Sequence, residues 1–162
     1  MRAADLMSRK LITVAPDDTV EVAVKLLRQR GVRHLLVMKT DRLVGIVSDR
    51  DIKRAMDPTR TKKKLLGIGG LYFLLEPILV REIMTPDPVT IGPGLPAQEA
   101  AAVMVAERFG ALPVQKNGKT IGIVTETDLL RCFARSGADA PREGKKPRRP
   151  AAKRRGGTQA TP

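Results

Sequence analysis

Apolar and polar positions follow one order of segments, and that order occurs twice along the chain. A short apolar run at residues 12–14 comes first. Apolar residues at i, i+3, i+4 and i+7 over residues 20–27 then predict a helix with one buried face. Two further apolar runs, at 34–38 and 43–47, predict a pair of strands, and a last helix is expected to begin near Ser48. Each half is therefore predicted to fold as a β-α-β-β-α unit.

The second occurrence is an internal repeat, because residues 7–54 align with residues 84–131 at a constant offset of 77. Twelve of the 48 aligned positions are identical, and no gap is needed. Such self-similarity indicates two copies of one supersecondary unit, which are expected to bury a shared face as a pseudo-twofold pair. The predicted fold class is α+β, with two tandem β-α-β-β-α repeats and a basic C-terminal tail.

The corresponding elements of the second copy are expected at residues 89–91, 97–104, 112–115 and 120–124, followed by a helix from Thr125. Between the last two strands stands Asn-Gly, the pair that most strongly favours a two-residue hairpin. Two aromatic side chains, Phe109 and Phe133, are expected in the core.

The composition narrows the chemistry. The chain has 162 residues, 30 Lys and Arg against 17 Asp and Glu, and a formal net charge of +13. With one cysteine, Cys132, and one histidine, His34, no intrachain disulfide and no usual four-ligand zinc site can form. No catalytic set is visible, so a binding protein is expected, not an enzyme. The N-terminus lacks a signal-peptide pattern, which predicts a cytoplasmic protein.

Positive charge is concentrated at the C-terminal end. Residues 137–162 contain eight Lys and Arg against two Asp and Glu, so they carry +6 of the formal +13. A segment without large apolar side chains cannot bury enough surface to offset its ordering entropy, so residues 136–162 are predicted to be disordered. This tail is either a solubilising appendage or an arm that binds nucleic acid or another polyanion.

The predicted repeats, residues 1–56 and 80–135, are joined by a connector at residues 57–79 that is expected to be partly helical. Its apolar stretch, residues 65–80, is shorter than the ~20 residues of a membrane-spanning helix and is interrupted by Glu76-Pro77. No membrane span is predicted. A buried or partner-facing connector is favoured over an anchor at a membrane surface.

A hydroxyl followed three residues later by a carboxylate stands at the predicted start of each last helix, as Ser48 and Asp51 and as Thr125 and Asp128. A helix N-terminus attracts phosphate, and a carboxylate in the first turn could accept two hydrogen bonds from ribose hydroxyls. The glycine before each pair would let a ligand or backbone approach closely. The same spacing is close to a capping box, in which the pair satisfies its own backbone amides. Both interpretations are open.

The stretches Gly45–Asp51 and Gly122–Asp128, with the Met-Thr-Pro-Asp-Pro-Val-Thr stretch at 84–90, resemble the CBS-domain pair, or Bateman module, of the stand-alone bacterial or archaeal type. The resemblance implies an adenosine nucleotide (AMP, ADP or ATP) or a related adenosyl ligand as regulatory ligand, with no required cofactor. It places Asp on ribose, Ser or Thr near phosphate, and the backbone of residues 13–14 and 90–91 beside adenine. It also implies a flat homodimer and an effector protein of unknown identity.

The first copy carries Arg33-His34 where the second has Gly110-Ala111. The family often places basic residues here to meet phosphates, so the cleft that they face is expected to prefer the more anionic nucleotide. Which cleft this is depends on how the copies pair. For His34 the alternative is a half-buried strand residue that is hydrogen-bonded to a neighbour. The predicted ligand-binding residues are Thr13, Val14, Arg33, His34, Ser48, Asp51, Thr90, Ile91, Thr125 and Asp128, and no metal ligand is predicted.

The predicted function is that of a regulatory sensor, in which an adenosine nucleotide binds between the copies and changes their relative packing. One alternative is an adaptor that binds nucleic acid or another polyanion through the basic tail, with the repeats as a dimerisation scaffold. A scaffold with empty clefts is a third hypothesis.

Overall fold

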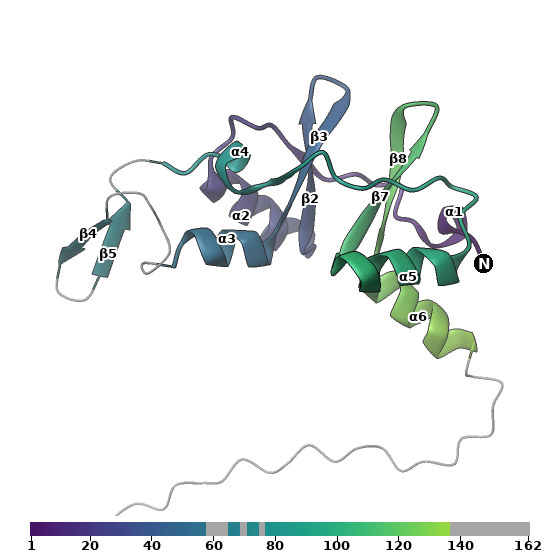
Figure 1. The fold of residues 1–162 in the computed structure, drawn as a ribbon. Coiled ribbons are helices and arrows are strands. Elements are labelled where there is room, and N and C mark those ends of the chain that lie inside the picture. Colours follow the sequence, from purple (N-terminus) through teal and green to yellow (C-terminus); the bar gives the residue numbers. More distant parts are fainter. Residues whose placement is uncertain (58–64, 69–70, 75–76, 137–162) are drawn as a thin grey trace, which may run out of the picture.

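The computed structural model describes residues 1–57, 65–68, 71–74 and 77–136 as two similar halves built from helices and short strands (Figure 1). The predicted α+β class with two repeats is confirmed. Ser136 is the last residue of a helix, and the rest of the tail predicted to be disordered lies outside the described residues.

The first half contains every element that the apolar pattern predicts. Strand β1 runs parallel to β2, and β2 pairs antiparallel with β3. Helix α2 ends at Gly31, whose φ of 62° lies in the left-handed region that glycine adopts without strain. The elements are β1 (Thr13–Val14), α2 (Val20–Arg30), β2 (His34–Lys39), β3 (Arg42–Ser48) and α3 (Asp49–Ala55).

The second half repeats this order with one difference. Strands β7 and β8 form the predicted hairpin, and Asn117 and Gly118 both have positive φ, as a type I′ turn requires. The strand expected at 89–91 is reduced to a single parallel bridge between Ile91 and Val114, because Pro113 of β7 has no N–H to donate where Leu36 of β2 donates to the carbonyl of Ile12. The elements are α5 (Ala97–Glu107), β7 (Ala111–Lys116), β8 (Lys119–Thr125) and α6 (Glu126–Ser136).

Each half is completed by the segment that precedes the other half in the sequence (Figure 1). Helix α1 (Ala3–Leu6) packs against α5 and α6, and Ser8 forms an antiparallel bridge with Ile123 of β8. In the same way, α4 (Val80–Ile83) packs on α3 and β3, and β6 (Thr85–Pro86) pairs with β3. The two halves are therefore interlocked by a reciprocal exchange that the apolar pattern did not predict.

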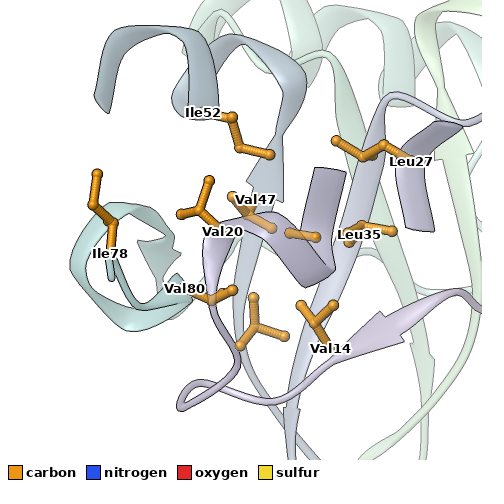
Figure 2. Close-up of a cluster of buried hydrophobic side chains, with 10 residues drawn as sticks. Val14, Val20, Leu27, Leu35, Val47, Ile52, Ile78 and Val80 are labelled. Atoms are coloured by element: carbon orange, nitrogen blue, oxygen red, sulfur yellow. The ribbon is translucent and has the colours of Figure 1, made fainter. Parts of the chain in front are cut away.

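The buried side chains show the same exchange. Figure 2 shows Ile78 and Val80, which precede the second half, beside Val20 and Val47 in the core of the first half. The second core takes in residues from the N-terminal segment. Its buried members are Ala3, Met7, Ile91, Ala100, Met104, Leu112, Val114 and Val124.

The two phenylalanines that were expected in the core differ. Phe109 packs against the second core, whereas Phe133 is 78% exposed on α6. The expectation for Phe133 is therefore wrong: Leu129 is the α6 residue that packs against the second core, and Phe133 lies one turn further along the helix.

The repeated strand glycine makes room for the exchanged segments. A Cβ added at Gly45 would collide with Sδ of Met84, and one added at Gly122 would collide with Sδ of Met7. The group that approaches each glycine closely is thus a methionine side chain from the opposite half. The sequence had instead suggested a ligand or a backbone segment at this place.

The described part of the connector forms strands β4 (Leu65–Ile68) and β5 (Leu71–Leu74), which pair antiparallel. The prediction of a partly helical connector is therefore wrong for these residues. The sequence signal for strands is the Gly-Gly pair between two short apolar runs. Among the residues that the structure describes, no helix is both long and apolar enough to cross a bilayer.

Candidate functional site

The hydroxyl–carboxylate pair at the start of each last helix forms a capping box. At α3, Oδ2 of Asp51 accepts hydrogen bonds from the backbone N (2.9 Å) and Oγ (2.6 Å) of Ser48. At α6, Oδ2 of Asp128 accepts them from the backbone N (2.9 Å) and Oγ1 (2.6 Å) of Thr125. The capping interpretation therefore describes the local structure, and it occupies one oxygen of each carboxylate.

Capping leaves the second oxygen of Asp128 available. Its Oδ1 lies 3.6 Å from Nη1 of Arg131, one turn later in α6, and the side chain of Asp128 is 20% exposed. A ribose hydroxyl can therefore donate a hydrogen bond to Oδ1 while the capping box stays intact. The two interpretations of this motif are compatible.

A cavity of about 280 Å³ lies between the two halves beside Asp128. Its apolar wall comes from Ile12, Leu36 and Ile123, which suits a flat, weakly polar group such as a purine base. Its polar lining comes from both halves. Four of the predicted binding residues lie there together: Arg33, His34, Thr125 and Asp128.

Arg33 links the halves across this cavity. Its Nη2 donates a hydrogen bond of 3.0 Å to Oγ1 of Thr127 in α6. The first backbone amide of α6, that of Glu126, donates to the carbonyl of Gly110 at 3.1 Å. An anion at this end of the helix would therefore meet the guanidinium and the later amides of the first turn.

His34 lies at the boundary between the halves. A Cβ added at Gly110 would be 2.9 Å from Nε2 of His34, so the ring packs against the backbone of the second half. Burial lowers the pKa of His34 below its ordinary value of 6.5, and Arg33 lowers it further. Three carboxylates act in the opposite direction: Asp49, Glu126 and Asp51.

The alternative for His34 was a hydrogen bond to a neighbour, and within the described residues its ring makes none. The alternative also predicted that His34 is half-buried, and the structure places it so. The ring also lines the cavity beside Asp128, so it is placed where a ligand could form a hydrogen bond with it.

The other predicted binding residues do not line this cavity. Val14 and Ile91 are buried in the first and second cores, and the side chains of Thr13 and Thr90 are exposed. Ser48 lines a smaller cavity of about 40 Å³ together with Arg33, His34 and Gly110. Asp51 lines neither cavity and is held in its capping box.

Sequence reasoning missed nine of the thirteen residues that line the cavity beside Asp128, among them Arg131, Thr127, Lys10 and Ile12. Arg131 follows Asp128 by three residues, a spacing that puts both on one helix face, so it could have been found. Thr127 stands at the position of Arg50 in the aligned repeats, a sequence difference that does not by itself indicate a cavity. Lys10 and Ile12 reach the cavity where the N-terminal segment crosses between the halves, and apolar periodicity carries no signal for that crossing.

The described residues hold no cluster of three or more His, Cys, Asp or Glu side chains arranged to bind a metal ion. Cys132 contacts Met1, with 3.5 Å between Sγ and Sδ, and lies in α6. The chemistry offered by the cavity beside Asp128 is therefore hydrogen bonding, positive charge and apolar contact.

Two β-α-β-β-α units with such a cavity between them define the class of paired α+β modules. Comparison with known proteins gives its family. A family model for the CBS domain matches residues 3–58 and 80–135, so the chain belongs to the CBS domain family, as the resemblance indicated.

Two curated relatives illustrate the range of proteins that carry this pair. A CBS domain-containing protein of Dictyostelium discoideum is 38% identical over 131 residues, which cover 77% of this chain and 86% of the relative. An inosine-5'-monophosphate dehydrogenase of Korarchaeum cryptofilum is 38% identical over 130 residues, which cover 80% of this chain and 24% of the dehydrogenase. The chain thus spans about a quarter of that enzyme.

Solved structures give the same fold. The CBS-pair protein CBSX2 of Arabidopsis thaliana is 26% identical, with a TM-score of 0.65 over 86% of this chain and 98% of that one. A structure of CBSX2 in complex with AMP is 27% identical, with a TM-score of 0.64 over 83% and 97% of the two chains. An uncharacterized conserved protein of Pyrococcus horikoshii is 28% identical, with a TM-score of 0.67 over 82% and 91%.

Proposed function

We propose that the chain is a regulatory module that binds an adenosine nucleotide or a related adenosyl ligand between its CBS repeats and passes a conformational change to a partner protein. The observation that carries this proposal is the cavity beside Asp128, which side chains from both halves line. A ligand held there contacts both halves, so it biases their packing if it favours one arrangement. The AMP complex of CBSX2 supports the ligand class.

The cavity suggests how such a ligand lies. The base packs on the apolar wall formed by Ile12, Leu36 and Ile123. The ribose hydroxyls donate to Oδ1 of Asp128, and a phosphate lies towards the guanidinium of Arg33. Because Arg33 and Asp128 belong to different halves, this one ligand bridges the pseudo-twofold interface.

The corresponding position on the other side of the pseudo-twofold axis is the candidate for a second site. Ser48 and Asp51 form the same capping box as Thr125 and Asp128. The backbone near Thr90 would take the place of the backbone near Thr13.

Isothermal titration calorimetry with AMP tests the proposal. Asp128→Asn is expected to weaken AMP binding by about tenfold or more, because a hydrogen bond to a charged acceptor contributes about 1.5–3 kcal/mol. Asp18→Asn is the control, since Asp18 also accepts a backbone hydrogen bond, from Ala15 at 2.7 Å, but does not line the cavity. If the unaltered chain binds none of AMP, ADP, ATP and 5'-methylthioadenosine, the proposal is wrong.

We also propose that the effector recognises a homodimer of this module. Large apolar side chains are exposed on neighbouring helices α5 and α6, where a second copy could cover them: Val105, Leu130 and Phe133. The identity of the effector and a cytoplasmic location both stay predictions from the sequence.

The alternative function, a polyanion-binding adaptor, is favoured by one observation, the +6 formal charge of residues 137–162. It predicts RNA or DNA binding that weakens steeply with salt, because phosphate contacts release counterions. Fluorescence anisotropy with the full chain and with a variant that ends at residue 136 distinguishes the functions. Binding that disappears in the shortened variant supports the adaptor, and equal binding by both variants contradicts it.

A further inference from the structure

We infer that the two pseudo-equivalent positions of this module differ in ligand, and that the cavity beside Asp128 takes an adenosine ligand carrying a chain of phosphates. This inference rests on the proposed function and adds the ligand's charge class and its place. It follows from comparing the two positions residue by residue.

The structure supports this comparison, because the strand contacts around the two positions correspond at the offset of 77. Ser8 bridges Ile123 on one side, and Thr85 pairs with Ile46 on the other. The helices that follow, α6 and α3, begin with the same capping box. Counterpart residues therefore occupy corresponding places around the pseudo-twofold axis.

The lining of the cavity beside Asp128 is rich in positive charge. Lys10, Arg33 and Arg131 all line it, and Asp128 is the one carboxylate among its lining residues. With His34 neutral, these four charged side chains give a formal balance of +2. Two of the cations come from the first half and one from the second, so the positive charge surrounds the space from both sides.

The counterpart position beside Asp51 lacks this excess of positive charge. Asp87 stands in place of Lys10, and Gly110 and Ala111 stand in place of Arg33 and His34. Arg54 corresponds to Arg131, and Arg50 replaces Thr127 as the one added cation. The formal balance of the counterpart residues is therefore zero: Arg50 and Arg54 against Asp51 and Asp87.

Arg33 is placed to read phosphate. Its planar guanidinium is oriented by the 3.0 Å hydrogen bond to Thr127, which brings it against the first turn of α6. Arginine binds phosphate through two parallel hydrogen bonds, and these are stronger than bonds between neutral groups. The uncharged thioether group of 5'-methylthioadenosine, in the place of the phosphates, would gain no charge-assisted hydrogen bond from Arg33 or Lys10. The cavity beside Asp128 therefore distinguishes adenosine ligands by charge.

Calorimetry on the full chain with ATP and with 5'-methylthioadenosine, which carries no phosphate, tests the inference. ATP is expected to bind at one strong site per chain, at least about tenfold more tightly than 5'-methylthioadenosine, since one charge-assisted hydrogen bond contributes that much. Arg33→Gly, which installs the counterpart residue, is expected to weaken ATP binding by about tenfold and to change 5'-methylthioadenosine binding by less than about threefold. Lys10→Asp, at an exposed position, is also expected to weaken ATP binding. Unlike Arg33→Gly, it leaves the Arg33–Thr127 hydrogen bond between the halves in place.

Asp128→Asn and Asp51→Asn form a matched pair, because both carboxylates cap a helix with the same geometry. The first is expected to weaken binding at the strong ATP site by about tenfold or more, and the second to leave it unchanged. Equal affinities for ATP and 5'-methylthioadenosine, or loss of the ATP site in Asp51→Asn alone, would overturn the inference while the proposed function stands. Absence of binding by both ligands would overturn the two together.

Discussion

At the scale of single residues, His34 couples the interface between the halves to pH. Its ring packs against Gly110, and burial lowers its pKa below 6.5. The unfolded chain, where this pKa is ordinary, then binds the proton more readily than the folded chain does. The free energy of unfolding is therefore expected to fall as the pH drops through 6.5 towards the folded pKa, and this contribution is present in full above 6.5.

Urea unfolding at about pH 7.5 and about pH 5.5 measures this effect as the difference between the unaltered chain and His34→Gln, because other groups titrate in both. The unaltered chain is expected to lose more stability on acidification than the variant. An equal loss in both proteins would show that His34 is not buried at the interface.

Some residues of the site could be predicted because their signal is local. Thr125 and Asp128 belong to one motif at the start of a helix, and Arg33-His34 stands out against Gly110-Ala111 in the aligned repeats. Which helix start faces Arg33 could not be predicted, because it depends on the packing of two halves that are distant in sequence. The carboxylate of Asp128 also both caps α6 and lines the cavity. The spacing of the motif alone could not show which of these two roles applies.

At the scale of elements, periodicity predicted the helices and the paired strands of both halves, since each depends on neighbours a few residues away. It did not predict that α1 and α4 exchange partners. That exchange depends on contacts such as Met7 against Gly122, which are far apart in the sequence. The described residues 65–68 and 71–74 of the connector form strands where a partly helical connector was predicted, because apolar composition suits a helix and a strand alike.

The exchange makes a prediction about cooperativity. Met7 belongs to the first repeat in sequence but is buried in the core of the second, so Met7→Ala is expected to destabilise the chain by about 2 kcal/mol or more. Hydrogen-exchange mass spectrometry is expected to show the larger loss of protection in α5, β7 and β8.

Met56→Ala is the control, because Met56 is exposed and its replacement is expected to change stability by less than about 0.5 kcal/mol. Loss of protection concentrated in α2, β2 and β3 of the Met7→Ala variant would contradict the exchanged arrangement.

At the scale of the whole molecule, the two repeats have diverged in their outer surfaces as well as in their clefts. The exposed apolar residues of the second repeat, Val105 and Leu130, have the counterparts Arg28 and Lys53 in the first. Exposed apolar side chains on neighbouring helices, such as α5 and α6, are typical of an interaction site where they form a patch. The second repeat is therefore the expected centre of the proposed homodimer.

Light scattering after size-exclusion chromatography tests this expectation. The unaltered chain is expected at twice the mass of one chain, and Phe133→Glu, alone or with Leu130→Glu, is expected to lower the mass to that of a monomer because a buried unpaired charge opposes association. Val22→Glu, on the first repeat, is the control that should stay dimeric. A monomeric unaltered chain, or a dimer that survives both charges, would contradict the assignment.

The central claim is that residues from opposite repeats meet around one nucleotide. Its most direct test is a crystal structure of the full chain grown with ATP. The account predicts density for the nucleotide beside α6, with the ribose on Oδ1 of Asp128 and the phosphates within hydrogen-bonding distance of Arg33. Nucleotide bound beside Asp51 with the Asp128 position unoccupied, or contacts to one repeat only, would contradict it.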